Sequence, residues 1–161
     1  MALEYKATFT IPKIPLFTGD PAKIIQREIA REVRAIVETL ATETKQHTPV
    51  FSGNLRDSIF ATVDLGEKAD VTGRVGSGKQ APYARFVEEG TRPHFPPVGA
   101  LRLWAGRVLG DERLAFVVAR AISRRGSRGR FMFRNAWRQI APSIGRRLQA
   151  AMDRAARTLE G

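Results

Sequence analysis

The chain has no cysteine and only two histidines among its 161 residues. The lack of cysteine excludes disulfides, thiolate zinc sites, iron–sulfur clusters and thiol catalysis, and it suits folding in a reducing compartment. No apolar run approaches the roughly 18 residues of a membrane-spanning helix, and the first residues do not predict a secretory signal. We expect His47 at a helix C-terminus and His94 packed among prolines. Their separation is not that of metal ligands, so we expect neither metal nor cofactor.

Catalytic motifs are also scarce. Glu88 and Glu89 are adjacent and do not converge on one substrate, and the chain has neither a nucleophile elbow nor a zincin helix, so we expect no enzyme. The stretch Gly73–Gln80 resembles a phosphate-binding loop. However, Gln80 stands where a hydroxyl is needed, and Pro82 follows where a helix should start. A turn at the end of a strand is therefore the better interpretation, and an NTPase is a distant third hypothesis.

Positive charge is what the chain has in excess. Its net charge is +11, and residues 101–161 carry 14 arginines against 4 carboxylates, which is +10 of that total. An acidic partner such as nucleic acid would explain this bias, but so would a solvated basic face or contacts with acidic neighbouring subunits. The candidates for DNA-channel or ring contacts are Arg124, Arg125, Arg128, Arg130, Arg134 and Arg138.

The first half of the chain alternates between strand and helix patterns. Residues 3–11 alternate apolar and polar side chains, which predicts a strand or extended arm within residues 1–17. A long helix is expected over 20–46, ended by Pro49. Its apolar stripe consists of Ile25, Ile29, Val33, Ile36 and Leu40. A β-hairpin is expected next, with Ile59, Ala61, Val63 and Leu65 on one face of its first strand and Val71, Gly73 and Val75 in the second.

The second half is predicted to be helical. Residues 93–129 show two helical patterns, near 97–108 and 111–123, which predict an inserted helical hairpin. This insertion is too small for a core of its own, so it should pack on the main domain or on a neighbour, with Val117, Val118 and Ile122 in the packing. A last helix is expected over 134–159, kinked or restarted at Pro142. Its stripe is Ala136, Ile140, Ile144, Leu148, Met152, Ala155 and Leu159.

Three motifs occur in a familiar order. Thr48–Ile59 reads TPVFSGNLRDSI, Tyr83–Thr91 reads YARFVEEGT, and Phe131–Ala136 reads FMFRNA. Together they resemble the tail-completion (neck, head–tail joining) proteins of long-tailed bacteriophages and prophages, over roughly residues 20–159. The chain departs from that pattern at Ser52, where threonine is usual, and at Arg130, where proline is common.

The resemblance implies an α+β fold: a small, mainly antiparallel sheet packed against two long helices, in a single tail-completion domain over 1–161. It implies that Tyr83, Phe86 and Val87 are buried anchors and that Gly90 has a positive φ. Phe131 and Phe133 are expected to be core aromatics. The motif residues with implied structural roles are Pro49, Gly53, Leu55, Tyr83, Phe86, Glu88, Gly90, Thr91, Phe131 and Phe133.

The function implied is structural. Such a subunit forms a homo-oligomeric ring, expected to be a hexamer, in the virion neck after assembly in the host cytoplasm. Its expected partners are the head-completion or connector proteins and the tail-terminator or tail-tube proteins. Contact with DNA would be transient and non-specific, and no membrane is involved. The alternative is a basic, non-specific nucleic-acid-binding protein that acts in solution.

Overall fold

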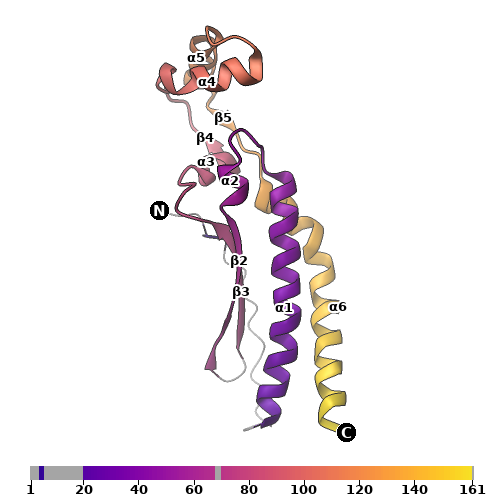
Figure 1. Cartoon of the computed structure of the whole chain (residues 1–161). Coiled ribbons are helices and arrows are strands. Elements are labelled where there is room, and N and C mark those ends of the chain that lie inside the picture. The colour runs from indigo at the N-terminus through magenta and orange to yellow at the C-terminus, as the bar shows by residue number, and fades with distance from the viewer. Residues whose placement is uncertain (1–3, 6–19, 68–69, 161) are drawn as a thin grey trace.

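The computed structural model describes residues 4–5, 20–67 and 70–160 (Figure 1). Two long helices, α1 (Asp20–His47) and α6 (Met132–Glu160), lie side by side and run in opposite directions. A β-hairpin covers α1, and a pair of shorter helices sits at the end where α1 finishes and α6 begins. The molecule is therefore elongated along the two long helices. This arrangement confirms the predicted α+β fold.

The apolar stripes of the two long helices meet in the core. All five residues of the predicted α1 stripe are buried, and so are Ala136, Ile140 and Ile144 of the α6 stripe. The large apolar side chains recur every three or four residues, so burial of one face stabilises each helix. α6 continues through Pro142 without restarting. Of the two outcomes expected at this proline, a restart is therefore wrong.

The sheet packs on α1. β2 (Ile59–Leu65) and β3 (Val71–Ser77) are antiparallel, with Ile59 opposite Ser77 and Leu65 opposite Val71. β1 (Glu4–Tyr5) pairs with the other edge of β3, at Val75 and Gly76, and the rest of the predicted arm lies outside the described residues. A Cβ on Gly73 would lie 2.6 Å from a methyl group of Val37, so glycine allows β3 to lie directly on α1.

Three side chains in or near the sheet were predicted to face inward, but they are exposed. Leu65 is 60% exposed, so the apolar face of β2 ends before it. Tyr83 and Phe86 are 40% and 57% exposed and are not buried anchors. The residues of α3 (Ala84–Glu89) that face inward are Ala84 and Glu88. The segment is helical, so its inward face repeats every four residues, and the aromatic side chains fall on the outside.

We call residues 93–126 the knob. It contains α4 (Val98–Leu109) and α5 (Leu114–Arg125), the predicted helical hairpin, and it lies at one tip of the molecule (Figure 1). The side chains buried in it are alanines: Ala105, Ala115 and Ala119. Small side chains let two short helices approach closely, but they leave larger apolar groups outside.

Two predictions about side chains of the knob are wrong. Val117 is 59% exposed and does not take part in packing, although Val118 and Ile122 are half-buried. His94 is exposed rather than packed, and its Nδ1 lies 2.9 Å from the carbonyl oxygen of Arg92.

Candidate functional site at the arginine-rich end

The knob joins the rest of the fold through a narrow two-stranded base. β4 (Gly90–Thr91) pairs with β5 (Ser127–Arg128), and the hydroxyls of Thr91 and Ser127 lie 2.9 Å apart. Gly90 has φ +82°, the positive value that its position predicts. A Cβ at Gly90 would collide with the carbonyl oxygen of Ser127. Glycine is thus required here both for the backbone conformation and for the close approach of the two strands.

The side chain of Glu88 connects the two-stranded β4–β5 segment to α6 through hydrogen bonds. Its side chain is fully buried, and its two carboxylate oxygens accept hydrogen bonds from the backbone N–H groups of Phe133 (3.0 Å) and Arg134 (3.1 Å). The first N–H groups of a helix have no partner within the helix, and negative charge is favourable at that end. Glu88 therefore caps α6 from a distance of 45 residues along the chain.

This contact shows what the family-like motifs do together. The backbone N–H groups of Arg130 and Phe131 donate to the carbonyl oxygens of Val87 (2.8 Å) and Glu88 (3.0 Å). The segment ending at Thr91 and the segment beginning at Arg130 are thereby held as one unit. In the sequence, Glu88 stands out as one half of an acidic pair and as a residue of the motif that resembles the phage family, and neither feature predicts the cap of α6.

The six candidate arginines gather around the same end. Arg124 and Arg125 end α5, Arg128 lies in β5, and Arg134 and Arg138 occupy the first turns of α6. All six, Arg130 included, are exposed, and among the described residues none of them forms an ion pair. The tertiary structure thus concentrates unpaired positive charge on one end of the rod.

Of the two aromatics in this region, Phe133 is buried as predicted. Phe131 is only half-buried, so it is not a core residue. Its backbone has φ +53°. The guanidinium of Arg134 lies 4.4 Å from the centre of the Phe131 ring. This cation–π contact orients the arginine without neutralising it.

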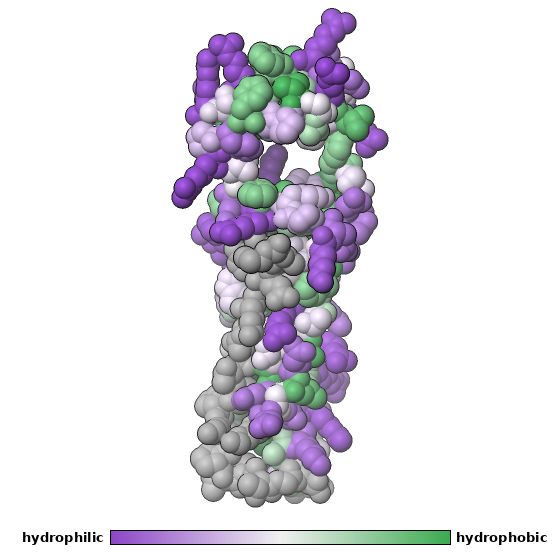
Figure 2. Space-filling model, turned by 90° about the vertical axis from the view of Figure 1, so that its left-hand side faces the viewer, coloured by the Kyte–Doolittle hydropathy of each residue, from purple (hydrophilic) through white to green (hydrophobic). Residues whose placement is uncertain are grey.

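An apolar groove lies between α4 of the knob and the segments 49–55 and 83–87, where the surface is hollowed (Figure 2). Its volume is about 850 Å³. Several wall residues are large and exposed: Val50 is 59% exposed, Phe86 57% and Val108 56%. The guanidinium of Arg107 stacks 5.2 Å from the centre of the Phe51 ring at the same place. The remaining lining comes from Pro49, Ser52, Gly53, Leu55, Tyr83, Val87, Trp104 and residues 127–130.

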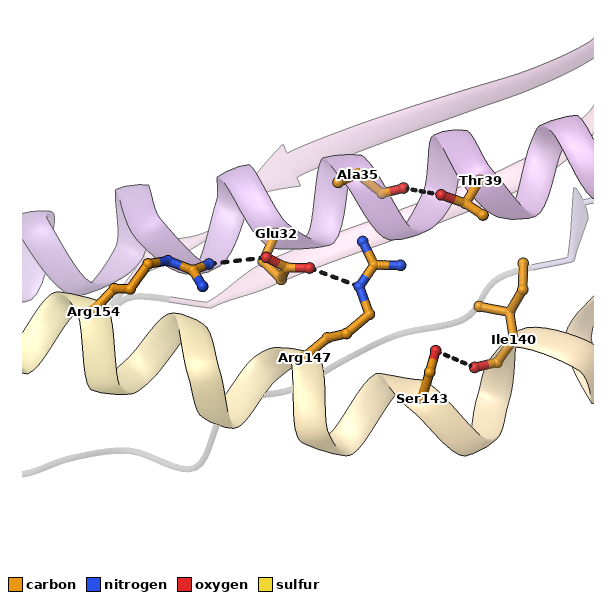
Figure 3. Close-up of polar contacts among 7 residues, drawn as sticks. All are labelled: Glu32, Ala35, Thr39, Ile140, Ser143, Arg147 and Arg154. Carbon is orange, nitrogen blue, oxygen red and sulfur yellow. Dashed lines mark hydrogen bonds and ion pairs between the residues drawn. The ribbon is translucent and has the colours of Figure 1, made fainter.

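Other arginines of α6 are used internally (Figure 3). The carboxylate of Glu32 in α1 accepts hydrogen bonds from Arg147 Nε (2.7 Å) and Arg154 Nη2 (2.9 Å). Arg154 also lies 3.6 Å from Glu28. Burial by itself would raise the pKa of Glu32, but hydrogen bonds and charge from the two arginines outweigh it and lower the pKa below 4.5. These arginines link α1 to α6, so they are a separate set from the exposed six.

Two kinds of site are absent from the part of the chain that the structure describes. No three histidine, aspartate or glutamate side chains gather as a metal site would require. No helix there combines the length and the apolar character that crossing a bilayer demands.

Comparison with known proteins supports the resemblance. Residues 20–90 match the model of the family described as bacteriophage HK97-gp10, putative tail-component. The match begins at the first residue of α1 and ends at Gly90, just before the knob. No curated protein and no solved structure shows significant similarity to the chain. The resemblance to phage tail proteins is thus confirmed over the first long helix, the hairpin and α3.

Proposed function

We propose that the chain is a structural subunit of a phage neck, one of a ring that joins the tail tube to the head connector. The observation that carries this proposal is the match of residues 20–90 to a phage tail-component family. In this role the protein is not an enzyme. It resides in the virion and assembles in the host cytoplasm.

The surface of the molecule supports a role in assembly. Leu103, Phe116 and Val117 of the knob are 67%, 55% and 59% exposed, and together with the groove they leave much apolar surface uncovered. Contiguous exposed apolar surface marks sites of protein–protein contact. We propose a ring of six subunits. Its partners are the head-completion or connector proteins on one side and the tail-terminator or tail-tube proteins on the other.

The six exposed arginines would face the DNA channel, an adjacent ring or a neighbouring subunit. A channel needs weak, sequence-independent contacts, because tight binding would obstruct passage of the genome. Arginine contacts to phosphates release counterions and weaken steeply as the salt concentration rises. We therefore expect DNA affinities of micromolar or weaker at physiological salt, as for ordinary non-specific binding.

The neck role is tested in the phage or prophage that encodes the chain. Deleting the gene should yield full heads and complete tails that are not joined, and expression of the intact protein from a plasmid should restore joined particles. Antibody labelling in electron micrographs should mark the junction between head and tail. Normally joined particles without the protein would contradict the neck role.

Affinity for DNA distinguishes the alternative, a nucleic-acid-binding protein acting in solution. Replacing Arg124, Arg125, Arg128 and Arg130 by serine should flatten the salt dependence of binding to a random-sequence duplex. Replacing the exposed Arg146 and Arg157, which lie farther along α6, is the control and should change it less. Nanomolar, sequence-selective binding would favour a DNA regulator. No binding even at low salt would assign the arginines to contacts between protein rings.

A further inference from the structure

We infer that the β2–β3 hairpin end of one copy docks into the groove beside the knob of the next copy. We define the hairpin end as Asp64–Glu67 together with Asp70. The inference rests on the proposed function in that it presumes an oligomer, and it identifies the surfaces that would join its subunits.

Hydrogen bonds hold the backbone of the hairpin end at Gly66 and Asp70, and an apolar side chain is exposed beside them. The backbone N–H of Gly66 donates to the carbonyl oxygen of Asp70 (2.8 Å), which closes the described part of the turn. The side-chain amide of Gln26 in α1 donates to the carbonyl oxygens of Gly66 (2.9 Å) and Asp70 (3.3 Å). Leu65 is nevertheless 60% exposed. An apolar group on a backbone that is already ordered can be buried by a partner at little further entropic cost.

The net charge of residues 64–70 is −2, because three carboxylates (Asp64, Glu67 and Asp70) stand against Lys68. Glu67 and Asp70 are exposed, and neither forms an ion pair among the residues that the structure describes. Asp64 is paired with Arg74 at 2.9 Å, so its charge is already compensated. Two carboxylates, Glu67 and Asp70, thus follow Leu65 closely in the chain and have no ion pair among the described residues.

The groove has the complementary properties. Its walls carry exposed apolar side chains from α3, α4 and the segment that follows α1, and Arg128 and Arg130 lie among its lining residues. Residues 93–129 contain seven arginines and two carboxylates, a net charge of +5. Its volume of about 850 Å³ holds more than one side chain. Leu65, with Glu67 and Asp70 close after it in the chain, thus fits an apolar cleft with arginines beside it, in both polarity and charge.

The two surfaces cannot meet within one molecule. The hairpin end lies toward the start of α1, whereas the groove lies beyond the end of that helix (Figure 1). A contact between them is therefore between copies and is heterologous, because each copy uses two different surfaces. Heterologous contacts produce a closed ring when the rotation between neighbours divides a full turn, and an open helix otherwise.

Single substitutions on either surface test the inference by sedimentation over a range of protein concentrations. Leu65→Ser on the hairpin and Val108→Asp in the groove should each weaken self-association about tenfold or more, as loss of a central apolar contact does. Both side chains are more than half exposed, so folding should be retained. Leu109→Ser, also at an exposed position of α4 but not lining the groove, is the matched control and should assemble like the unaltered protein.

Mixing the two variants identifies the geometry. Leu65→Ser retains an intact groove, and Val108→Asp retains an intact hairpin end. A mixture should form heterodimers and nothing larger, because one good contact remains for each pair.

Charge reversal is a second check. Arg128→Glu with Arg130→Glu should weaken assembly, and combination with Glu67→Arg and Asp70→Arg should restore it. Arg120→Glu, on the exposed surface of α5 outside the groove lining, is the control for charge.

Several results would overturn the inference. The unaltered protein could be a monomer at every concentration, or both single variants could assemble like it. The mixture of the two variants could stay monomeric, or the variants could lose only the binding of DNA or of another virion protein. None of them decides the neck role, which depends on whether particles join when the gene is deleted. Conversely, confirmed docking together with normally joined deletion particles would retain the interface and refute the neck role.

Discussion

Replacing Glu88 should destabilise the protein more than replacing any other carboxylate at this end of the molecule. In Glu88→Ala the backbone N–H groups of Phe133 and Arg134 lose their acceptors, the first of them in a buried position. A hydrogen bond to a charged group contributes about 1.5–3 kcal/mol, so two should contribute about 3–6 kcal/mol. Water entering the vacated space will recover some of this, and we expect a loss of about 3–5 kcal/mol in the free energy of unfolding.

Thermal unfolding at one fixed protein concentration measures this loss. For a chain of this size the melting temperature should fall by roughly 6–20 °C. Glu88→Gln keeps one acceptor oxygen but turns a donor toward the other N–H group, so its loss should be smaller, about 1–3 kcal/mol. The amides of Phe133 and Arg134 should also exchange hydrogen faster in both variants.

Glu89→Ala is the matched control. Its carboxylate is exposed and forms a surface ion pair with Arg85 at 3.0 Å, so its loss should cost no more than about 0.5 kcal/mol. If Glu88→Ala cost less than about 1 kcal/mol, or no more than Glu89→Ala, the cap of α6 would not be a stabilising contact and the reasoning would be refuted.

Three further predictions follow from the same structure. Gly90→Val should cost about 3 kcal/mol or more in thermal melts, because strain at positive φ adds to the collision with Ser127. Gly110→Ala, at φ +79° with open space around it, should lower the free energy of unfolding by only about 1 kcal/mol. If Gly90→Val and Gly110→Ala lost the same amount, the collision with Ser127 would not contribute. Glu32→Gln should lower stability by about 1–3 kcal/mol at neutral pH in urea unfolding. Because the pKa of Glu32 is lowered in the folded protein, the stability difference between the unaltered protein and Glu32→Gln should be present above pH 4.5 and vanish as the pH falls through the lowered pKa. A stability difference that did not change with pH would refute this role of Glu32.

Local patterns in the sequence predicted the secondary structure well. The stripe from Ile25 to Leu40 has the spacing of an amphipathic helix, and its burial follows directly from that spacing. The alternation in residues 59–65 and 71–75 predicted the hairpin for the same reason. In both cases the physical determinant is contained within a few neighbouring residues. The positive φ of Gly90 was expected from the family resemblance and is confirmed, but its need for glycine also involves Ser127, which is distant in the chain.

Exposure at the arginine-rich end was predicted less well. The family resemblance placed Tyr83 and Phe86 inside, and the helical pattern placed Val117 there, yet all three are exposed. A helix of six residues has one inward face, and in α3 that face is taken by Ala84 and Glu88. In the knob, alanines occupy the helix contact and displace larger side chains outward. Which face turns inward depends on what it meets, and a single segment does not contain that information.

The sequence by itself determined the helices, the hairpin and the bias of positive charge toward the C-terminal part, because spacing and composition are properties of the chain. The tertiary structure decided what these elements do together. It brought Glu88 to the first amides of α6, directed Arg147 and Arg154 toward Glu32, and left six other arginines at one end without an ion pair among the described residues. Such contacts join residues 45 to 122 positions apart. They depend on distances in space, which no local pattern specifies.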